Sequence, residues 1–196
     1  GGNSNNVEAT APYSAIGGGR DNVVQAQYAN LAGGRNNTVA TGADYSMVPG
    51  GYRAVAARTG QEVMASGAFS TLDGTAQVSR QVLRAETTDN ANTRLTTDGS
   101  ASANAYNTAN LVANSAYAVH GILTATDTNP AVADARMWEI KALVKRGALP
   151  SSTVIVGTPS ITDVAGDSGA SGWVVSVAAD ATNGAVSVTV TGAPAT

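Results

Sequence analysis

The chain has 196 residues, of which 43% are hydrophobic and only 13% charged; it has no cysteine and a net charge of −3. The charge balance excludes the basic patch of a nucleic-acid-binding surface. No apolar run approaches the roughly 20 residues of a membrane helix, and no disulfide is available to stabilise the fold. The abundant small and β-branched residues favour stacked strands over a helical enzyme. The chain begins without methionine and already inside a repeat, so we expect it to be a piece of a longer protein.

Residues 1–67 repeat one pattern about four times. Glycine pairs recur every 15 to 17 residues, at 1–2, 18–19, 33–34 and 50–51. A valine, a tyrosine and an aliphatic residue follow in order, aligned as Val7, Val23, Val39 and Val55, then Tyr13, Tyr28 and Tyr45, then Ile16, Leu31 and Val48. A degraded fourth unit ends at Ser66-Gly67, with Glu62 in the place of the tyrosine. This period is too short for a helical hairpin repeat, which needs about 33 residues or more. It fits two short strands and two turns, so the pattern predicts a β-solenoid.

The repeat predicts structural roles for its glycines and tyrosines. Glycine takes a positive φ without cost, so we expect the pairs to turn the corners of the coils; these residues are Gly18, Gly33, Gly34, Gly50 and Gly51. Gly33 and Gly50 are expected to need a positive φ or a close approach to the next coil. The asparagine runs at 5–6 and 36–37 suit the second corner. The tyrosines at 13, 28 and 45 should stack as a ladder with a strand spacing of about 4.7 to 4.9 Å.

Two or three aliphatic residues in each coil make a thin core, which predicts that a second apolar set is buried in a homotrimer. The stretch YSAIGGGRDNVVQAQYANLAGGRNNTVATGADYSMVPGG resembles the head repeats of trimeric autotransporter adhesins, and more closely the related repeats of bacteriophage tail fibres and spikes. The resemblance implies a homotrimeric rod on the virion, extracellular and in contact with other tail proteins. It also implies binding to a bacterial surface polysaccharide or outer-membrane receptor, without membrane insertion.

Beyond the repeat we expect a connecting β segment at 68–114 and a C-terminal β-sandwich or jelly roll at 115–196, so the fold class is all-β. Strands are predicted at 75–86, 93–97, 115–126 and 136–146, with a loop or extended linker at 98–111. In 136–146, the apolar residues Trp138, Ile140, Ala142 and Val144 alternate with Glu139, Lys141 and Lys145, as in a half-buried antiparallel strand. The segments 172–179 and 184–192 flank Asn183-Gly184, a strong hairpin signal. Residues 115–192 also resemble a module found at the C-terminal ends of phage and prophage tail proteins.

No catalytic, metal or cofactor site is predicted. His120 is the only histidine and lies in a strand pattern, so it is interpreted as structural or incidental. No GxSxG, phosphate-loop or zinc spacing occurs. The acidic residues of the repeat do not match in register as a catalytic pair would; they are Glu8, Asp21, Asp44, Glu62 and Asp73. Asp163, Asp167 and Asp180 lack the spacing of a calcium loop, and Trp138 and Trp173 are expected to anchor the core.

Receptor contact is expected in two polar breaks between strands, 127–135 and 163–171, because loops on a rigid scaffold vary without disturbing it. The candidate binding residues there are Asp127, Asn129, Asp163 and Asp167. The tyrosine ladder is the competing site, since aromatic faces bind sugars. The sequence therefore predicts a non-enzymatic receptor-binding or structural part of a tail fibre. The alternatives are a bacterial trimeric adhesin head, a polysaccharide-degrading tail spike, and a shaft without a ligand.

Overall fold

The computed structural model describes residues 2–69, 71–127 and 133–192. Within these ranges the regular structure is β-strand apart from two short 3-10 turns, η1 (Pro150–Ser152) and η2 (Ser168–Gly172), so the predicted all-β class is confirmed. The chain divides into two compact units. The first is Gly1–Arg84 with Thr96–Asp98 and Asn104–Val112, and the second is Ala85–Leu95, Gly99–Ala103 and Ala113–Thr196. The expected connector at 68–114 is therefore shared between the two units.

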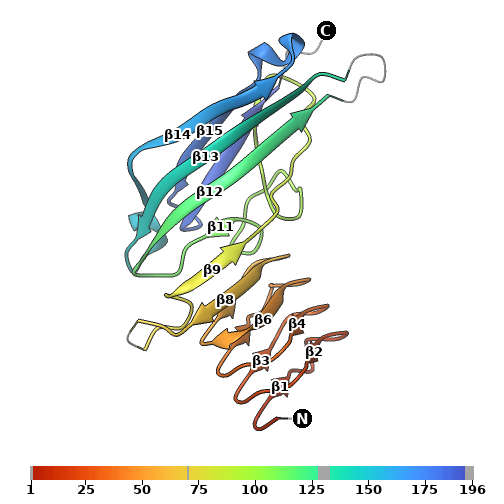
Figure 1. The fold of residues 1–196 in the computed structure, drawn as a ribbon, viewed down its shortest axis with the longest axis vertical. Helices are drawn as coiled ribbons and strands as arrows, with labels where there is room; N and C mark the ends of the chain where they lie inside the picture. Colours follow the sequence, from red (N-terminus) through yellow and green to blue (C-terminus); the bar gives the residue numbers. More distant parts are fainter. Residues whose placement is uncertain (1, 70, 128–132, 193–196) are drawn as a thin grey trace. The chain divides into compact units, whose positions relative to one another are not determined.

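In the first unit the chain winds as a β-solenoid of four coils, as predicted (Figure 1). One parallel sheet contains β1 (Asn6–Val7), β3 (Val23–Val24), β5 (Thr38–Val39) and β7 (Val55–Ala56). The second contains β2 (Ala15–Ile16), β4 (Asn30–Leu31), β6 (Met47–Tyr52) and β8 (Glu62–Ser66), and is extended by antiparallel β9 (Gln77–Arg80). A further short strand, β11 (Ala109–Asn110), lies later in the same unit. Each coil is thus one strand from each parallel sheet, and coils 1 to 4 are named in chain order.

The core of the solenoid is a column of small aliphatic side chains. The predicted row of Ile16, Leu31 and Val48 is confirmed, because these residues are in register across β2, β4 and β6. The predicted valine row is wrong by one residue in two coils: Val23 pairs with Asn6 and Thr38. The row that faces inward in coils 2 to 4 is Val24, Val39 and Ala56, each fully buried. The core is as thin as the sequence predicts, because most of its other buried residues are alanines, whose side chains are small.

The corner glycines that carry the steric constraint are the second members of the pairs. Gly34 has φ +92, and a Cβ built on it would lie 2.2 Å from the carbonyl oxygen of Gly51. Gly19 and Gly51 are equivalent, with φ +85 and +112. The prediction for Gly33 is wrong, because a Cβ there would meet only the backbone of Gly18 at 3.8 Å and its φ is not positive. Gly50 does have a positive φ, +151, although the space around it is open.

The segment after β8 closes the solenoid at coil 4. Besides the pairing of β9 with β8, the side-chain amide of Gln77 accepts a hydrogen bond from Val55 N at 2.9 Å and donates to Val55 O at 3.1 Å. Gly74 N donates to Arg53 O at 3.0 Å, and the Arg53 guanidinium forms an ion pair with Asp73. Backbone groups that would otherwise pair with a fifth coil are therefore bonded to this segment.

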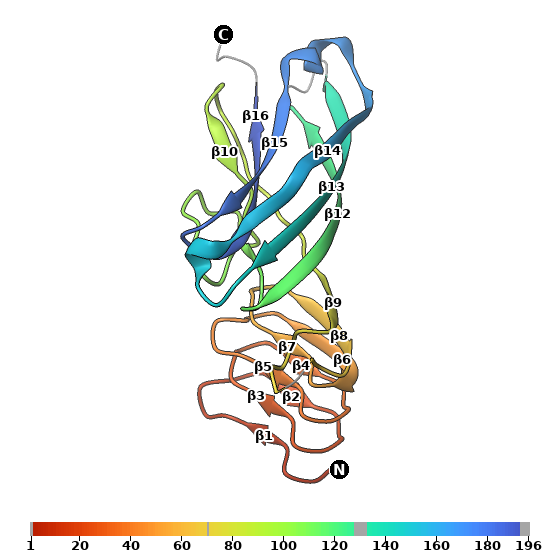
Figure 2. The same ribbon diagram turned by 90° about the vertical axis from the view of Figure 1, so that its left-hand side faces the viewer.

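The second unit contains two antiparallel sheets, drawn as separate layers in Figure 2. One is a meander of β12 (Ser115–Thr126), β13 (Ala135–Arg146) and β14 (Val154–Gly166). In the other, β16 (Ala185–Thr191) lies between β15 (Val174–Asp180) and β10 (Asn92–Arg94). The predicted strands at 115–126 and 136–146 and the C-terminal hairpin are confirmed. Trp138, Ile140 and Val144 are buried, with Glu139, Lys141 and Lys145 on the opposite face.

Three predicted boundaries in the rest of the chain are wrong. The strand expected at 75–86 is only four residues long, Gln77–Arg80, and the one expected at 93–97 ends at Arg94. The break expected at 163–171 is mostly regular, because β14 continues to Gly166 and η2 follows at once. The strand-forming residues Ile161, Thr162 and Val164 continue β14 through Asp163, where the sequence predicts a loop.

None of the helical segments in the described part of the chain is long and apolar enough to span a membrane.

Candidate functional site

The binding residues expected in loops are engaged in the scaffold where the structure describes them. The Asp163 carboxylate pairs with the Arg136 guanidinium, and Asp167 Oδ2 accepts a hydrogen bond from Ala135 N at 2.9 Å. Both contacts hold β14 and η2 against the start of β13. Asp127 directly follows β12, and its backbone N donates to Asp134 O at 3.1 Å; Asn129 lies outside the described residues. Whether any of these four contacts a receptor stays a prediction.

His120 belongs to a small ion cluster on the outward face of the β12–β13 hairpin. Its Nε2 lies 2.9 Å from Glu139 Oε1, and Lys141 Nζ lies 3.1 Å from the same oxygen. Hydrogen bonds from Lys141 and then His120 lower the pKa of the Glu139 carboxyl. The imidazole is 62% exposed and the carboxylate 35% exposed, which suits surface ion pairing.

The acidic residues of the solenoid each have a different neighbour. Glu8 accepts from Gln25 Nε2 at 2.8 Å, Asp44 accepts from the backbone and side chain of Gln27, and Asp21 pairs with Arg20. In the described ranges no group of three or more His, Cys, Asp or Glu residues is arranged to hold a metal ion. The solenoid carboxylates therefore serve coil-to-coil and surface contacts.

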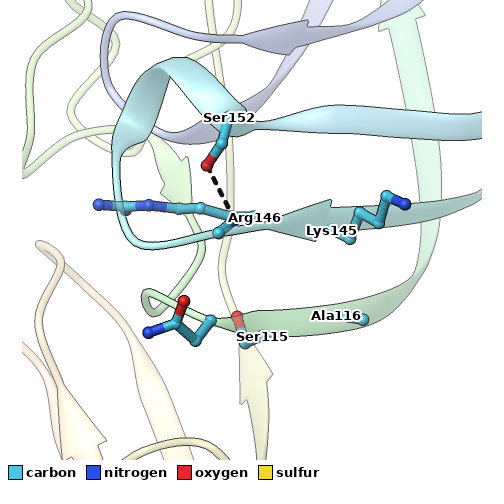
Figure 3. Close-up of a pocket in the computed structure, with 7 residues that line it drawn as sticks. Ser115, Ala116, Lys145, Arg146 and Ser152 are labelled. Carbon is cyan, nitrogen blue, oxygen red and sulfur yellow. Dashed lines mark hydrogen bonds between the residues drawn. The ribbon is translucent and has the colours of Figure 1, made fainter.

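A shallow depression lies where the start of β12, the end of β13 and η1 meet (Figure 3). Its lining includes Asn114, Ser115, Lys145, Arg146 and Ser152, and the hydroxyl of Ser152 accepts a hydrogen bond from Gly147 N at 2.8 Å. Lys145 and Arg146 are consecutive on β13, so their side chains are expected to leave opposite faces of the sheet, and in Figure 3 they extend away from each other. The two cations do not converge, and the depression lacks the focused charge of an anion site.

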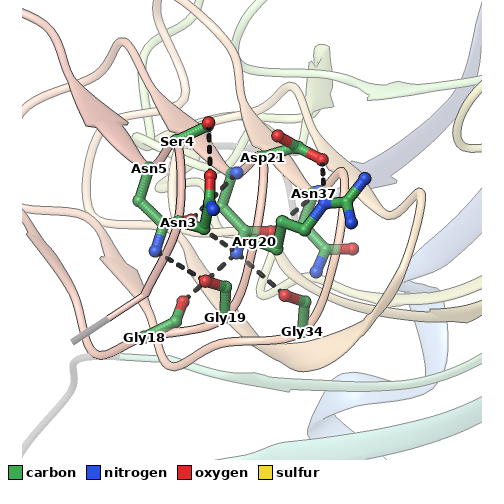
Figure 4. A network of polar contacts seen from close by, with 10 residues as sticks. Asn3, Ser4, Asn5, Gly18, Gly19, Arg20, Asp21, Gly34 and Asn37 are labelled. Atoms are coloured by element: carbon green, nitrogen blue, oxygen red, sulfur yellow. Dashed lines mark hydrogen bonds and ion pairs between the residues drawn. The ribbon is translucent and has the colours of Figure 1, made fainter.

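A buried asparagine ladder ties the coils together (Figure 4). Asn37 is fully buried; its Nδ2 donates to Gly33 O at 3.0 Å and to Gly51 O at 2.9 Å, and its Oδ1 accepts from Ala54 N at 2.9 Å. Asn22 makes the same three kinds of contact one coil earlier. Each asparagine thus satisfies the corner carbonyls of two coils. Sequence reasoning placed asparagine at a corner but missed the ladder. The signal for it is an asparagine three residues after the second glycine of each of the first three pairs.

The corner of each coil also contains a left-handed residue just before the ladder position. These residues are Ser4, Asp21, Asn36 and Arg53, with φ between 54° and 63°. The prediction of a left-handed corner at 36–37 is confirmed for Asn36, whereas in the first coil it is Ser4 and not 5–6 that takes this conformation.

The tyrosine ladder is confirmed and is the most exposed aromatic feature of the solenoid. The ring centroids of Tyr13 and Tyr28, and of Tyr28 and Tyr45, are 5.0 Å apart, with interplanar angles of 10° and 1°. The three residues are 81%, 45% and 63% exposed. All three have positive φ, between 56° and 63°, a conformation that is uncommon for an aromatic residue. Stacking at this distance covers both faces of the middle ring and leaves one open face at each end of the ladder.

The structure corrects the alignment of the tyrosine row in coil 4, where the fourth position (rung) of the ladder is Gly60 and not Glu62. Glu62 pairs with Met47 across β6 and β8, so the residue opposite Tyr45 is Gly60. Gly60 N donates to Asp44 O at 2.8 Å, as Tyr45 N does to Gln27 O at 3.1 Å. Gly60 also has the left-handed φ of the tyrosines, +67. The prediction that Ser66-Gly67 is the fourth glycine pair is also wrong, because Gly50 and Gly51 pair with Met64 and Ala65. Counting back from Ser66-Gly67 placed Glu62 in the tyrosine row.

Comparisons with protein-family models, with curated proteins and with solved structures return no match for this chain.

Proposed function

We propose that the chain is a non-enzymatic structural and receptor-binding part of a bacteriophage tail fibre, exposed on the virion, which binds the surface of a host bacterium. The observation that carries this proposal is the four-coil solenoid with an exposed ladder of stacked tyrosines. A regular stack of coils makes a stiff shaft, and the exposed aromatic rings give that shaft a surface suited to saccharides. The resemblance of the repeat to tail fibres and spikes supports the same assignment.

The shaft is proposed to work as a homotrimer in which the C-terminal unit forms a β-sandwich or jelly roll. A column of valine, leucine and alanine is a small core for four coils. On β8 and β9 the paired residues Met64 and Val78 are 58% and 60% exposed. A trimer interface over these side chains would remove apolar surface from water. Three equivalent weak sites on one rigid shaft would then bind a bacterial envelope with avidity.

Two alternatives have their own support and their own readout. The adhesin resemblance favours a bacterial trimeric adhesin head, and an anchor encoded elsewhere in the same gene would decide for it. A depolymerase needs paired carboxylates, whereas the acidic residues described in the solenoid have separate polar partners. Release of reducing ends from capsule by the purified protein would establish the depolymerase.

Two measurements test the proposal. Analytical ultracentrifugation is expected to give a mass near three times the 19.5 kDa of the chain, and a stable, folded monomer would overturn the trimer. Adsorption of the labelled protein to whole bacteria is expected for a host strain and absent for others. Failure to adsorb to any strain of a broad panel, together with a trimeric mass, would leave a purely structural shaft.

A further inference from the structure

The fourth rung of the tyrosine ladder has the backbone of a tyrosine corner without the ring. Gly60 has φ +67 against 56° to 63° for the tyrosines, and its N–H makes the same coil-to-coil hydrogen bond. A Cβ built on Gly60 would meet no atom within 4 Å. The space that a fourth ring would occupy is therefore open at its base.

This change leaves an aromatic face uncovered. One face of Tyr45 is stacked on Tyr28, and among the described residues no second ring is stacked on it. The exposure of the two residues agrees: Tyr45 is 63% exposed, whereas Tyr28, which is stacked on both faces, is 45% exposed. The backbone of Gly60 lies next to this rung, because Gly60 N donates to Asp44 O at 2.8 Å. Tyr13, in the first described coil, is 81% exposed.

We propose that the rung at Gly60 binds one pyranose ring of a bacterial surface polysaccharide, stacked on the open face of Tyr45; this rests on the proposed receptor-binding function. The face of an aromatic ring carries partial negative charge, which attracts the C–H bonds on the apolar face of a pyranose. A pyranose chair whose axial C–H bonds face Tyr45 continues the stack. The other face of the ligand stays in water, and a hydroxylated ring tolerates that exposure better than an aromatic side chain does.

One polar group lies at the rim of the open face. The neighbouring carboxylate of Asp44 is directed the other way, toward coil 2, where it accepts hydrogen bonds from Gln27 N and Nε2, both at 3.1 Å. The Tyr45 hydroxyl adds a donor at the rim of the ring. A ring stacked at this rung thus meets an apolar face with one hydrogen-bonding group at its edge, and such combinations of apolar and polar contacts are usual in small-molecule sites.

The test is to add the missing fourth ring to the ladder. Gly60→Tyr should adopt the left-handed conformation, as tyrosine does at the three other rungs, and place its ring against Tyr45. Gly60→Ala is the matched control, because its Cβ meets open space and leaves the aromatic face accessible. The probes are methyl β-glucopyranoside, methyl β-galactopyranoside and methyl α-mannopyranoside, followed by saturation-transfer NMR on the intact protein.

At least one probe is expected to receive saturation at its axial ring protons. That signal should weaken at least about five-fold in Gly60→Tyr and in Tyr45→Ala, as loss of one aromatic contact predicts, and should persist in Gly60→Ala and Tyr13→Ala. A full signal in Gly60→Tyr overturns the proposal, as does a signal that depends on Tyr13 and not on Tyr45. Absence of any signal from the parent overturns it as well. Circular dichroism of each variant establishes that the solenoid is folded.

The bacterial adsorption assay distinguishes this proposal from the proposed function. A parent that adsorbs to host cells without a Tyr45-dependent saccharide signal would retain the function and lose the site. A parent that gives the signal but adsorbs to no strain would retain the saccharide site and lose the receptor-binding function.

Discussion

The two units of the chain hold their backbones together by different means. In the solenoid, one contact recurs at each coil, as when Asn22 and Asn37 bond equivalent glycine carbonyls. In the second unit the important polar contacts occur once, as in the ion pair between Arg94 and Asp180 at 2.7 Å. Repetition lets each residue be compared with its equivalent in the next coil. A departure such as Gly60 in a row of tyrosines then stands out, whereas a single contact has no equivalent to reveal it.

The largest expected effect separates the two members of a glycine pair. Gly34→Ala places a Cβ 2.2 Å from Gly51 O at a φ of +92, so coil 3 must move away from coil 4. We expect a loss of about 3 kcal/mol or more in the free energy of unfolding, measured by urea denaturation with circular dichroism.

Gly33→Ala is the matched control, because its added Cβ meets only ordinary contacts at 3.8 Å. Its stability should stay within about 1 kcal/mol of the parent. Equal losses in the two variants would mean that the coils do not approach at the second glycine, and the repetitive packing of the solenoid would be wrong.

The next effect tests the asparagine ladder. Asn37→Ala removes the donor to Gly33 O and Gly51 O and the acceptor for Ala54 N, and these groups lie at the packed corner of the coil. Leaving buried polar groups without partners should cost about 2 to 3 kcal/mol, seen as a lower urea midpoint.

Asn5→Ala makes a comparison within the same ladder. Asn5 is only partly buried and donates to Gly19 O at 3.0 Å, so water can replace part of what it loses. Its variant should be affected about half as much as Asn37→Ala. A larger loss at Asn5 than at Asn37 would contradict the ladder as a source of stability.

The repeat made most of the solenoid predictable. The ladder of Tyr13, Tyr28 and Tyr45 and the inward row through Leu31 follow from spacing alone, because a fixed period places equivalent residues above one another. The errors occurred where the residue pattern allowed two alignments. Val23 was aligned in place of its neighbour Val24, although Val24 lies at the same distance from its glycine pair as Val7 and Val39 do. Glu62 was aligned in place of Gly60 because Ser66-Gly67 resembles a glycine pair, whereas the residues that pair with Gly50 and Gly51 are Met64 and Ala65.

The second unit was predictable only as strands. Alternation revealed β12, β13 and the C-terminal hairpin, because a half-buried sheet imposes a period of two. The same rule does not tell which distant side chains meet. The Asp163–Arg136 and Asp180–Arg94 pairs join residues that are far apart in sequence. An aspartate in a polar run was therefore interpreted as loop surface when its partner lay on another strand.

The smallest expected effect concerns one of these single contacts. Asp180 ends β15 and is buried; its Oδ1 accepts from Thr182 N at 2.9 Å and Asn183 N at 3.0 Å, and its Oδ2 accepts from Asn183 Nδ2 at 2.7 Å. Asp180 thereby holds the four-residue turn between β15 and β16. Asp180→Asn keeps the shape but removes the charge, and we expect a loss of about 1 to 2 kcal/mol at neutral pH.

The pH dependence of this loss has a defined sign. Burial raises the pKa of Asp180, but hydrogen bonds from Asn183 and the charge of Arg94 outweigh it and leave the pKa below its ordinary value. A carboxyl whose pKa is lower in the folded state stabilises the fold above its unfolded pKa of about 3.9 and loses that contribution as the pH falls through the folded value. The parent and Asp180→Asn should therefore differ in thermal midpoint at pH 7 and converge below about pH 3.

The control is Glu139→Gln. The partly exposed carboxylate of Glu139 also has a lowered pKa through Lys141 and His120, but its replacement should change the midpoint little, since solvent screens the charge. A difference between parent and Asp180→Asn that stays constant from pH 7 to pH 3 would show that the charge of Asp180 does not contribute, and that the turn is held by the shape of its hydrogen bonds alone.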